Sequence, residues 1–159
     1  FHWLSATVLI IQIPLGMYLV DMDFGEKRLT VENIHVAVGI SIFYLTVLRL
    51  IYKAFNPTPK LNNSIFPGQK IIAKLNHVFL YISILMITIS GALKKLYNGE
   101  ELNMFFFNLE IQDNFELAEI FYEIHILGNY TLIALISLHI FAVLIHKILF
   151  KENLLKRIL

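Results

Sequence analysis

The chain has 159 residues, a formal net charge of +1 and no cysteine, and 57% of its residues are hydrophobic. Only 16% are charged, against about 25% in ordinary soluble chains. The lack of cysteine excludes disulfides, thiolate-bound metals, iron–sulfur clusters and covalently attached c-type haem. The near-neutral charge indicates no nucleic-acid partner. We expect a single domain, residues 1–159.

Four stretches free of Asp, Glu, Lys and Arg are long enough to cross, or nearly cross, a bilayer core of about 30 Å. None shows the charged face, recurring every three or four residues, of a helix in a soluble bundle. We therefore predict an all-α, integral membrane four-helix bundle. The second stretch is short, but Arg49 and Lys53 can snorkel from its end. The predicted helices span residues 1–20, 33–52, 75–93 and 124–149.

The first apolar stretch is interpreted as a membrane span, because it has neither the basic leader nor the cleavage site of a signal peptide. Pro14 is expected to kink this helix, which a bundle tolerates. We also expect the natural chain to carry a short stretch before Phe1.

The connecting segments predict the orientation. Residues 49–74 carry five basic and no acidic residues, and the tail from Lys147 carries four basic residues and one acidic residue. Residues 21–32 and 94–123 together carry four basic and eleven acidic residues. With four spans, the two basic regions share one side. The positive-inside rule then places both termini in the cytoplasm.

Two connections have features of their own. Pro57 and Pro59 break the cytoplasmic connection, because neither can continue a helix. The long outer loop, residues 94–123, contains an aromatic run at residues 104–107 that is expected to anchor at the membrane surface. Residues 116–122 are expected to form a short amphipathic helix on that surface.

All six histidines lie in or at the edge of an apolar stretch, where an ionisable side chain is costly and usually functional. A single histidine in a membrane most often only hydrogen-bonds a neighbouring helix. Six on four helices, with no carboxylate inside the spans to form a proton relay, instead favour a cofactor. The six are His2, His35, His77, His125, His139 and His146.

The fourth stretch holds two histidines on one face. His125 and His139 are 14 residues apart, a rise of about 21 Å. Fourteen steps of about 100° return to within about 40° of the first direction, so both rings point to the same side. Six histidines would give one such spacing by chance fairly often. Two haems stacked across a bilayer nevertheless need this arrangement.

Each haem iron then needs a second ligand at matching depth. His35 lies level with His125, and His2 lies near the end where His139 could reach it. We therefore predict two b-type haems with the axial pairs His35–His125 and His2–His139. Bis-histidine ligation leaves no open position on the iron, which suits electron transfer. His146, seven residues beyond His139, is a rival for the inner iron.

Two histidines remain, His77 and His146. Both are expected to lie toward the cytoplasmic end of their helices, as is Trp3. Trp3, His77 and His146 are predicted to bind a quinone, with the rings donating hydrogen bonds and protons to its carbonyls. Interfacial anchoring by the same side chains explains their positions equally well. Gly39, Gly91 and Gly128 could admit a flat macrocycle, but simple helix packing is as good an explanation.

These residues, in this order, resemble the bacterial cytochrome b-561 family, including its superoxide:ubiquinone oxidoreductases, over nearly the whole chain. The segments that carry the resemblance are His2-Trp3-Leu4, residues 34–41, Leu48-Arg49-Leu50, Pro57-Thr58-Pro59, Leu75-Asn76-His77, Ser90-Gly91, residues 125–130, Leu138-His139, Ile145-His146 and residues 152–157.

The resemblance implies haem ligands at His2, His35, His125 and His139, and quinone contacts at Trp3, His77 and His146. It also implies a location in the bacterial inner membrane, oxidation of superoxide on the periplasmic side and reduction of ubiquinone. Two features depart from the family. Its paired histidine near the end of the last helix is His146-Lys147 here, and the acidic outer loops do not favour an anionic substrate. Only a local cluster such as Lys27, Arg28, Lys94 and Lys95 could attract one.

Two other functions stay open. The chain could be the cytochrome b subunit of a partner dehydrogenase or hydrogenase, with a periplasmic redox partner and no substrate of its own. It could also be a haem-free helical protein that uses its histidines as a metal carrier or scaffold. The sequence does not choose ubiquinone over menaquinone, and it gives neither reduction potentials nor an oligomeric state.

Overall fold

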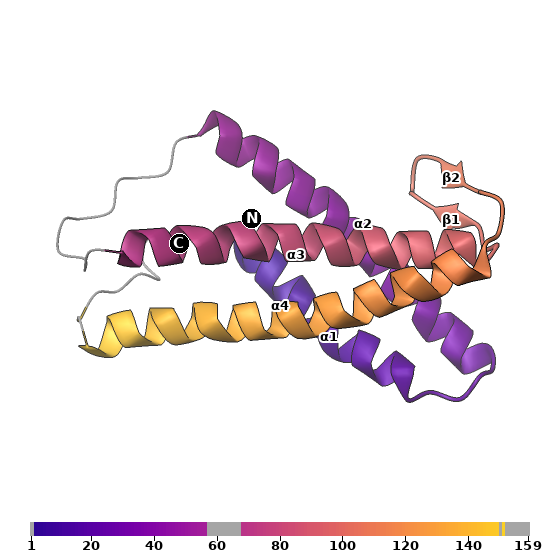
Figure 1. Cartoon of the computed structure of the whole chain (residues 1–159), viewed down its shortest axis with the longest axis horizontal. Helices are drawn as coiled ribbons and strands as arrows, with labels where there is room; N and C mark the ends of the chain where they lie inside the picture. Colours follow the sequence, from indigo (N-terminus) through magenta and orange to yellow (C-terminus); the bar gives the residue numbers. More distant parts are fainter. Residues whose placement is uncertain (1, 57–67, 150, 152–159) are drawn as a thin grey trace.

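The computed structural model describes residues 2–56, 68–149 and 151. Four helices account for most of them: α1 (His2–Val20), α2 (Glu26–Phe55), α3 (Gln69–Tyr97) and α4 (Phe115–Leu149). The short strands β1 (Leu102–Asn103) and β2 (Asn108–Leu109) form an antiparallel hairpin between α3 and α4 (Figure 1). The expected break at Pro57 and Pro59 and the tail from residue 152 lie outside the described residues.

The helices are longer than the charge-free stretches that predict them. α2 begins at Glu26 rather than near residue 33, and α4 begins at Phe115 rather than near residue 124. Residues 116–122 are helical, as expected, but they form the first turns of α4 rather than a short helix of their own. Charged residues mark the end of an apolar stretch in the sequence. They do not end the helix itself, because its backbone hydrogen bonds continue into the membrane–water interface. α1 runs through Pro14 as one helix.

Each of the four helices is long and apolar enough to cross a membrane. Most of each apolar window is exposed rather than buried inside the protein. Ile10, Leu127 and Ile148, for example, are 68–70% exposed. Since helices satisfy their own backbone groups, such apolar surfaces are compatible with lipid and would be unfavourable in water.

The helices form two antiparallel pairs, α1 with α2 and α3 with α4, and α2 also packs against α3 nearly as extensively as against α1. In Figure 1, α3 and α4 run side by side, and α1 and α2 run diagonally to them. The α3–α4 pair is the more extensive. Asn76, Ser83 and Ser90 are buried at seven-residue intervals along α3. Small polar residues of this kind let membrane helices approach closely.

The end of the molecule that holds the hairpin, here called the hairpin end, is closed by a small apolar core. Ile40, Leu96 and Leu102 are buried there. The Tyr44 hydroxyl donates to the backbone carbonyl of Met104 at 3.1 Å and so ties α2 to the hairpin. The phenylalanines of the aromatic run are 52–84% exposed. Their role as a membrane anchor stays a prediction.

Candidate functional site

Four of the six histidines meet in two pairs, each formed across the two helix pairs. The ring centroids of His35 on α2 and His125 on α4 lie 6.2 Å apart. Those of His2 on α1 and His139 on α4 lie 6.3 Å apart. Two imidazoles that share one metal through bonds of about 2 Å have centroids roughly 6 Å apart. Both separations therefore fit a metal held between two rings.

A cavity of about 330 Å³ lies between the helix pairs and is lined by residues of all four helices. Both His35 and His125 line it, together with Gly16, Gly39 and Gly91. Binding sites for small molecules and cofactors commonly start at about 300 Å³. The cavity thus offers room for a prosthetic group beside the first histidine pair.

Glycines of the neighbouring helices support the two rings of this pair. A Cβ on Gly16 of α1 would stand 2.8 Å from Cε1 of His35. A Cβ on Gly91 of α3 would stand 2.9 Å from both Cε1 and Nδ1 of His125. Any larger residue would push the ring away, so glycine is needed at both positions because of close approach. Gly128 instead packs against Ile87 and Met86, as expected for a helix contact.

The hydrogen bond of His125 fixes which ring nitrogen is free. Its Nδ1 lies 2.9 Å from the carbonyl oxygen of Ile87. A carbonyl only accepts, so Nδ1 carries the proton and the lone pair of a neutral ring is on Nε2. Metal-bound histidines usually have their second ring nitrogen held in this way. The hydrogen bond therefore leaves Nε2 of His125 with the lone pair that a metal ligand needs.

The second pair has a more crowded environment. The His77 ring lies 5.2 Å from the His139 ring, nearer than His2 does. Arg49 donates from Nη2 to Nδ1 of His2 at 3.0 Å. Because a guanidinium only donates, this contact leaves the proton of a neutral His2 on Nε2. Ligation through that Nε2 therefore requires Arg49 to give up the contact.

The three residues predicted to bind a quinone are only partly brought together. Trp3 is about half exposed, and its ring lies 5.6 Å from the His2 ring. His77 contacts His139, so these two side chains belong to one cluster. His146 is buried further along α4 and contacts Gln69 through its Nε2.

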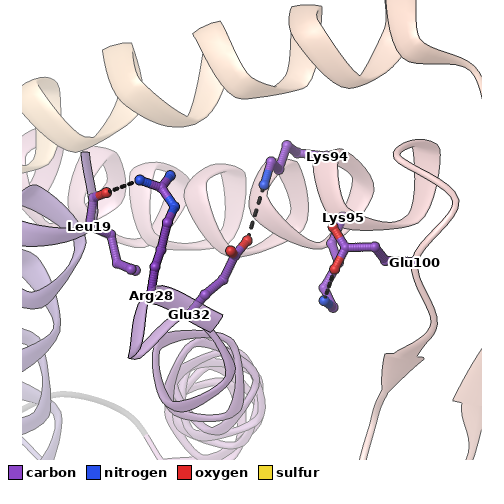
Figure 2. A network of polar contacts seen from close by, with 6 residues as sticks. All are labelled: Leu19, Arg28, Glu32, Lys94, Lys95 and Glu100. Atoms are coloured by element: carbon purple, nitrogen blue, oxygen red, sulfur yellow. Dashed lines mark hydrogen bonds and ion pairs between the residues drawn. The ribbon is translucent and has the colours of Figure 1, made fainter. Parts of the chain in front are cut away.

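Charged side chains line the cavity at the hairpin end, and most of them are paired (Figure 2). Lys94 forms an ion pair with Glu32 at 3.2 Å, and Lys95 forms one with Glu100. Arg28 donates from Nη1 to the carbonyl of Leu19 at 2.8 Å, at the end of α1. The cations of this cluster also join α1, α2 and α3.

Comparison with known proteins identifies the chain. The family described as prokaryotic cytochrome b561 matches residues 1–159. The chain belongs to this family. Cytochrome b561 homolog 2 of Escherichia coli (strain K12) is 26% identical over 163 aligned residues, which cover 100% of this chain and 87% of that protein. Cytochrome b561 homolog 1 of the same organism is 28% identical over 163 residues, covering 99% and 92%.

Membership confirms the predicted family and the all-α membrane fold. The chain is a multi-pass bacterial membrane protein and a b-type cytochrome for transmembrane electron transfer. The residues present fit a b-type haem, because the imidazoles of His35 and His125 are paired beside a cavity that is also lined by glycines. Nowhere in the described ranges do three or more His, Asp or Glu gather as a metal cluster. A cytochrome b561 needs only two protein ligands for each iron.

Two residues of this cytochrome b561 site were not predicted from the sequence. Gly16 supports His35, and Gln12 donates from Nε2 to the His35 carbonyl at 2.8 Å. Both come from α1, which contributes no ligand to this pair. A signal was present, since Gln12 is the one amide side chain inside an otherwise apolar first stretch.

Proposed function

We propose that this cytochrome b561 protein holds two b-type haems, one between His35 and His125 and the other between His2 and His139. The observation that carries the proposal is the pair of ring separations, 6.2 and 6.3 Å, at two levels of α4. The two levels are 14 residues apart, about 21 Å along the helix. When bound, the haems supply one-electron carriers at both levels of the membrane.

The two proposed haem sites differ in whether their histidines already have the tautomer and contacts that iron ligation needs. His125 already has its Nδ1 proton held by Ile87, which favours ligation through Nε2. His2 must first lose its contact with Arg49. His77 is a rival partner of His139, although its 5.2 Å separation is shorter than a shared metal favours. His146 is less suited to the inner iron, because it lies seven residues beyond His139 and contacts Gln69.

We further propose that the protein oxidises superoxide on the periplasmic side and reduces ubiquinone on the cytoplasmic side. Two superoxide ions each give up one electron and leave as dioxygen. One ubiquinone takes both electrons and two protons and leaves as ubiquinol. Trp3, His77 and His146 are assigned to the quinone, with the imidazoles donating hydrogen bonds and passing protons to its carbonyl oxygens.

Cations at the hairpin end are assigned to draw the anion in. Arg28, Lys94 and Lys95 all line the cavity beside His35 and His125. Positive potential in a cleft raises the encounter rate of an anion. Glu32 and Glu100 pair with the two lysines and weaken that potential. The attraction is therefore local and moderate.

The orientation that this function needs follows from the charges of the connections. Residues 49–74 and the segment from Lys147 onward together carry nine Lys/Arg in the sequence, whereas residues 21–32 and 94–123 together carry four. The positive-inside rule supports a cytoplasmic location for both termini and a periplasmic location for the hairpin. Superoxide then enters from the periplasm.

The test is stopped-flow mixing of superoxide with the purified protein and a soluble ubiquinone, while the haem absorption is recorded. Rapid haem reduction that depends on superoxide is expected, followed by reoxidation when quinone is present. Haems that stay oxidised would refute the superoxide reaction and favour an electron-transfer subunit of a dehydrogenase or hydrogenase. A purified protein without the reduced b-type band would refute the haem assignment itself.

A further inference from the structure

Gln12 is a buried polar side chain that the proposed electron transfer leaves without a role. It is only 8% exposed and lines the cavity beside His35. Its Nε2 donates to the His35 carbonyl, but its Oε1 is buried and meets no hydrogen-bond donor among the described residues. An amide oxygen buried in this way is unfavourable unless it serves another group.

The complementary atom lies on the residue that Gln12 already contacts. Nδ1 of His35 is also buried and has no hydrogen-bond partner within the described part of the chain. A neutral imidazole that bonds a metal through Nε2 carries its proton on Nδ1, and an amide oxygen can accept that proton's hydrogen bond. One acceptor and one donor are therefore both unused on neighbouring side chains.

His125, the other histidine of the pair, already has an acceptor for its Nδ1 proton. His125 rests on Gly91 and donates to the carbonyl of Ile87, four residues before that glycine. His35 rests on Gly16, and the residue four before that glycine is Gln12. Residues four apart lie on the same face of a helix. Ile87 offers its main-chain carbonyl, and Gln12 has an unused side-chain oxygen; both residues stand one turn before the glycine that supports the ring.

We propose that Gln12 is the positioning residue of His35, with Oε1 accepting the Nδ1 hydrogen bond while Nε2 keeps its bond to the His35 carbonyl. The inference rests on the proposed function, in which His35 is a haem ligand. The bond fixes the tautomer and makes the imidazole a stronger donor to iron, which favours the oxidised metal.

The test compares Gln12→Met, which keeps the size and loses the acceptor, with Gln12→Glu, which keeps an acceptor. Redox titration of the purified protein follows each haem by its absorption, and electron paramagnetic resonance reports the ring orientation. Gln12→Met is expected to raise the midpoint potential of one haem only, change its resonance signal and weaken its binding about 10-fold. Gln12→Glu is expected to leave that potential at or below the wild-type value.

Thr46→Val on α2 is the matched control, because Thr46 is equally buried and does not line the cavity. Gln12→Asn, with its shorter reach, replaces the methionine variant if that variant does not accumulate. Unchanged potentials and signals in the variant lacking the acceptor would overturn the inference. An equal shift of both haems, as from general loosening, would also overturn it.

His35→Ala, measured alongside, distinguishes a failed role of Gln12 from a failed assignment of His35 as a haem ligand. Loss of one haem in His35→Ala with no effect of Gln12→Met would refute the role of Gln12 alone. Retention of both haems in His35→Ala would refute the ligand assignment on which the role depends.

Discussion

The imidazole of His125 occupies the space that a side chain on Gly91 would need, with its Cε1 and Nδ1 each 2.9 Å from the position of a Cβ. His35 has the same relationship to Gly16, at 2.8 Å. Both rings are thereby held against a neighbouring helix, beside the cavity that both residues line. Close approach of a helix backbone explains these two glycines better than chain flexibility does.

Gly91→Ala and Gly16→Ala are therefore expected to reduce the haem content of the purified protein from two to about one per chain. The methyl group displaces the ring and breaks the Nδ1 bond of His125 in the first case, and outer contacts of this kind are worth about 10- to 100-fold in binding. A pyridine haemochrome assay against protein concentration measures the content.

Gly128→Ala is the control for these variants, because it does not line the cavity and its Cβ would meet Ile87 and Met86, at 2.8 and 3.0 Å, rather than a histidine. It should retain full haem content. Equal loss in all three variants would mean that the effect comes from helix packing and not from the histidines.

His125→Ala and His139→Ala are expected to remove one haem each and to leave the other iron six-coordinate. The reason is that each ring pairs with a different partner, His35 or His2. Haem assay and low-temperature spectra of the reduced protein measure the outcome. Two haems retained in both variants would contradict the pairing.

His77→Ala is expected to slow quinone reduction at least 10-fold while the haem content stays at two. A general acid that is removed commonly costs 10²–10⁴ in rate, and other donors at this end can replace part of it. Haem oxidation by a soluble quinone is followed after rapid mixing. A loss of haem would instead make His77 the partner of His139, from which its ring is 5.2 Å away.

His146→Ala is expected to give the same slow reduction with two haems present. His146 contacts Gln69 at the start of α3, so Gln69→Ala is a useful companion variant that perturbs this contact and keeps the imidazole. Slow reduction in the first variant only would assign the effect to the ring. A missing haem in His146→Ala would show that this residue, and not His139, binds the inner iron.

Glu32→Gln is expected to raise the rate of haem reduction by superoxide several-fold, and Lys94→Gln is expected to lower it. Lys94 and Glu32 form an ion pair at 3.2 Å on the cavity wall, so removal of the carboxylate exposes one positive charge to the entering anion. Stopped-flow rates at several salt concentrations measure the effect. The difference between the variants should shrink at high salt, since charges are then screened. Equal rates in both variants at low salt would contradict a role for this pair.

The amino-acid sequence by itself determined the four membrane helices and their chemistry. Long charge-free stretches have one stable solution in lipid, a helix, because every backbone group must be satisfied internally. The regular geometry of a helix likewise set His125 and His139 on one side of α4 at two depths. Helix ends were predicted less well, as the early start of α4 at Phe115 shows.

Only the tertiary structure decided what each histidine meets. The contacts of His35 with Gly16 and Gln12, and the approach of His77 to His139, depend on how each helix is rotated about its axis and how the pairs cross. Apolar helix faces look alike in sequence, because lipid and a neighbouring helix are equally hydrophobic partners. The hydrophobic pattern therefore fixes where a helix lies in the membrane, and close packing alone fixes which way its side chains point.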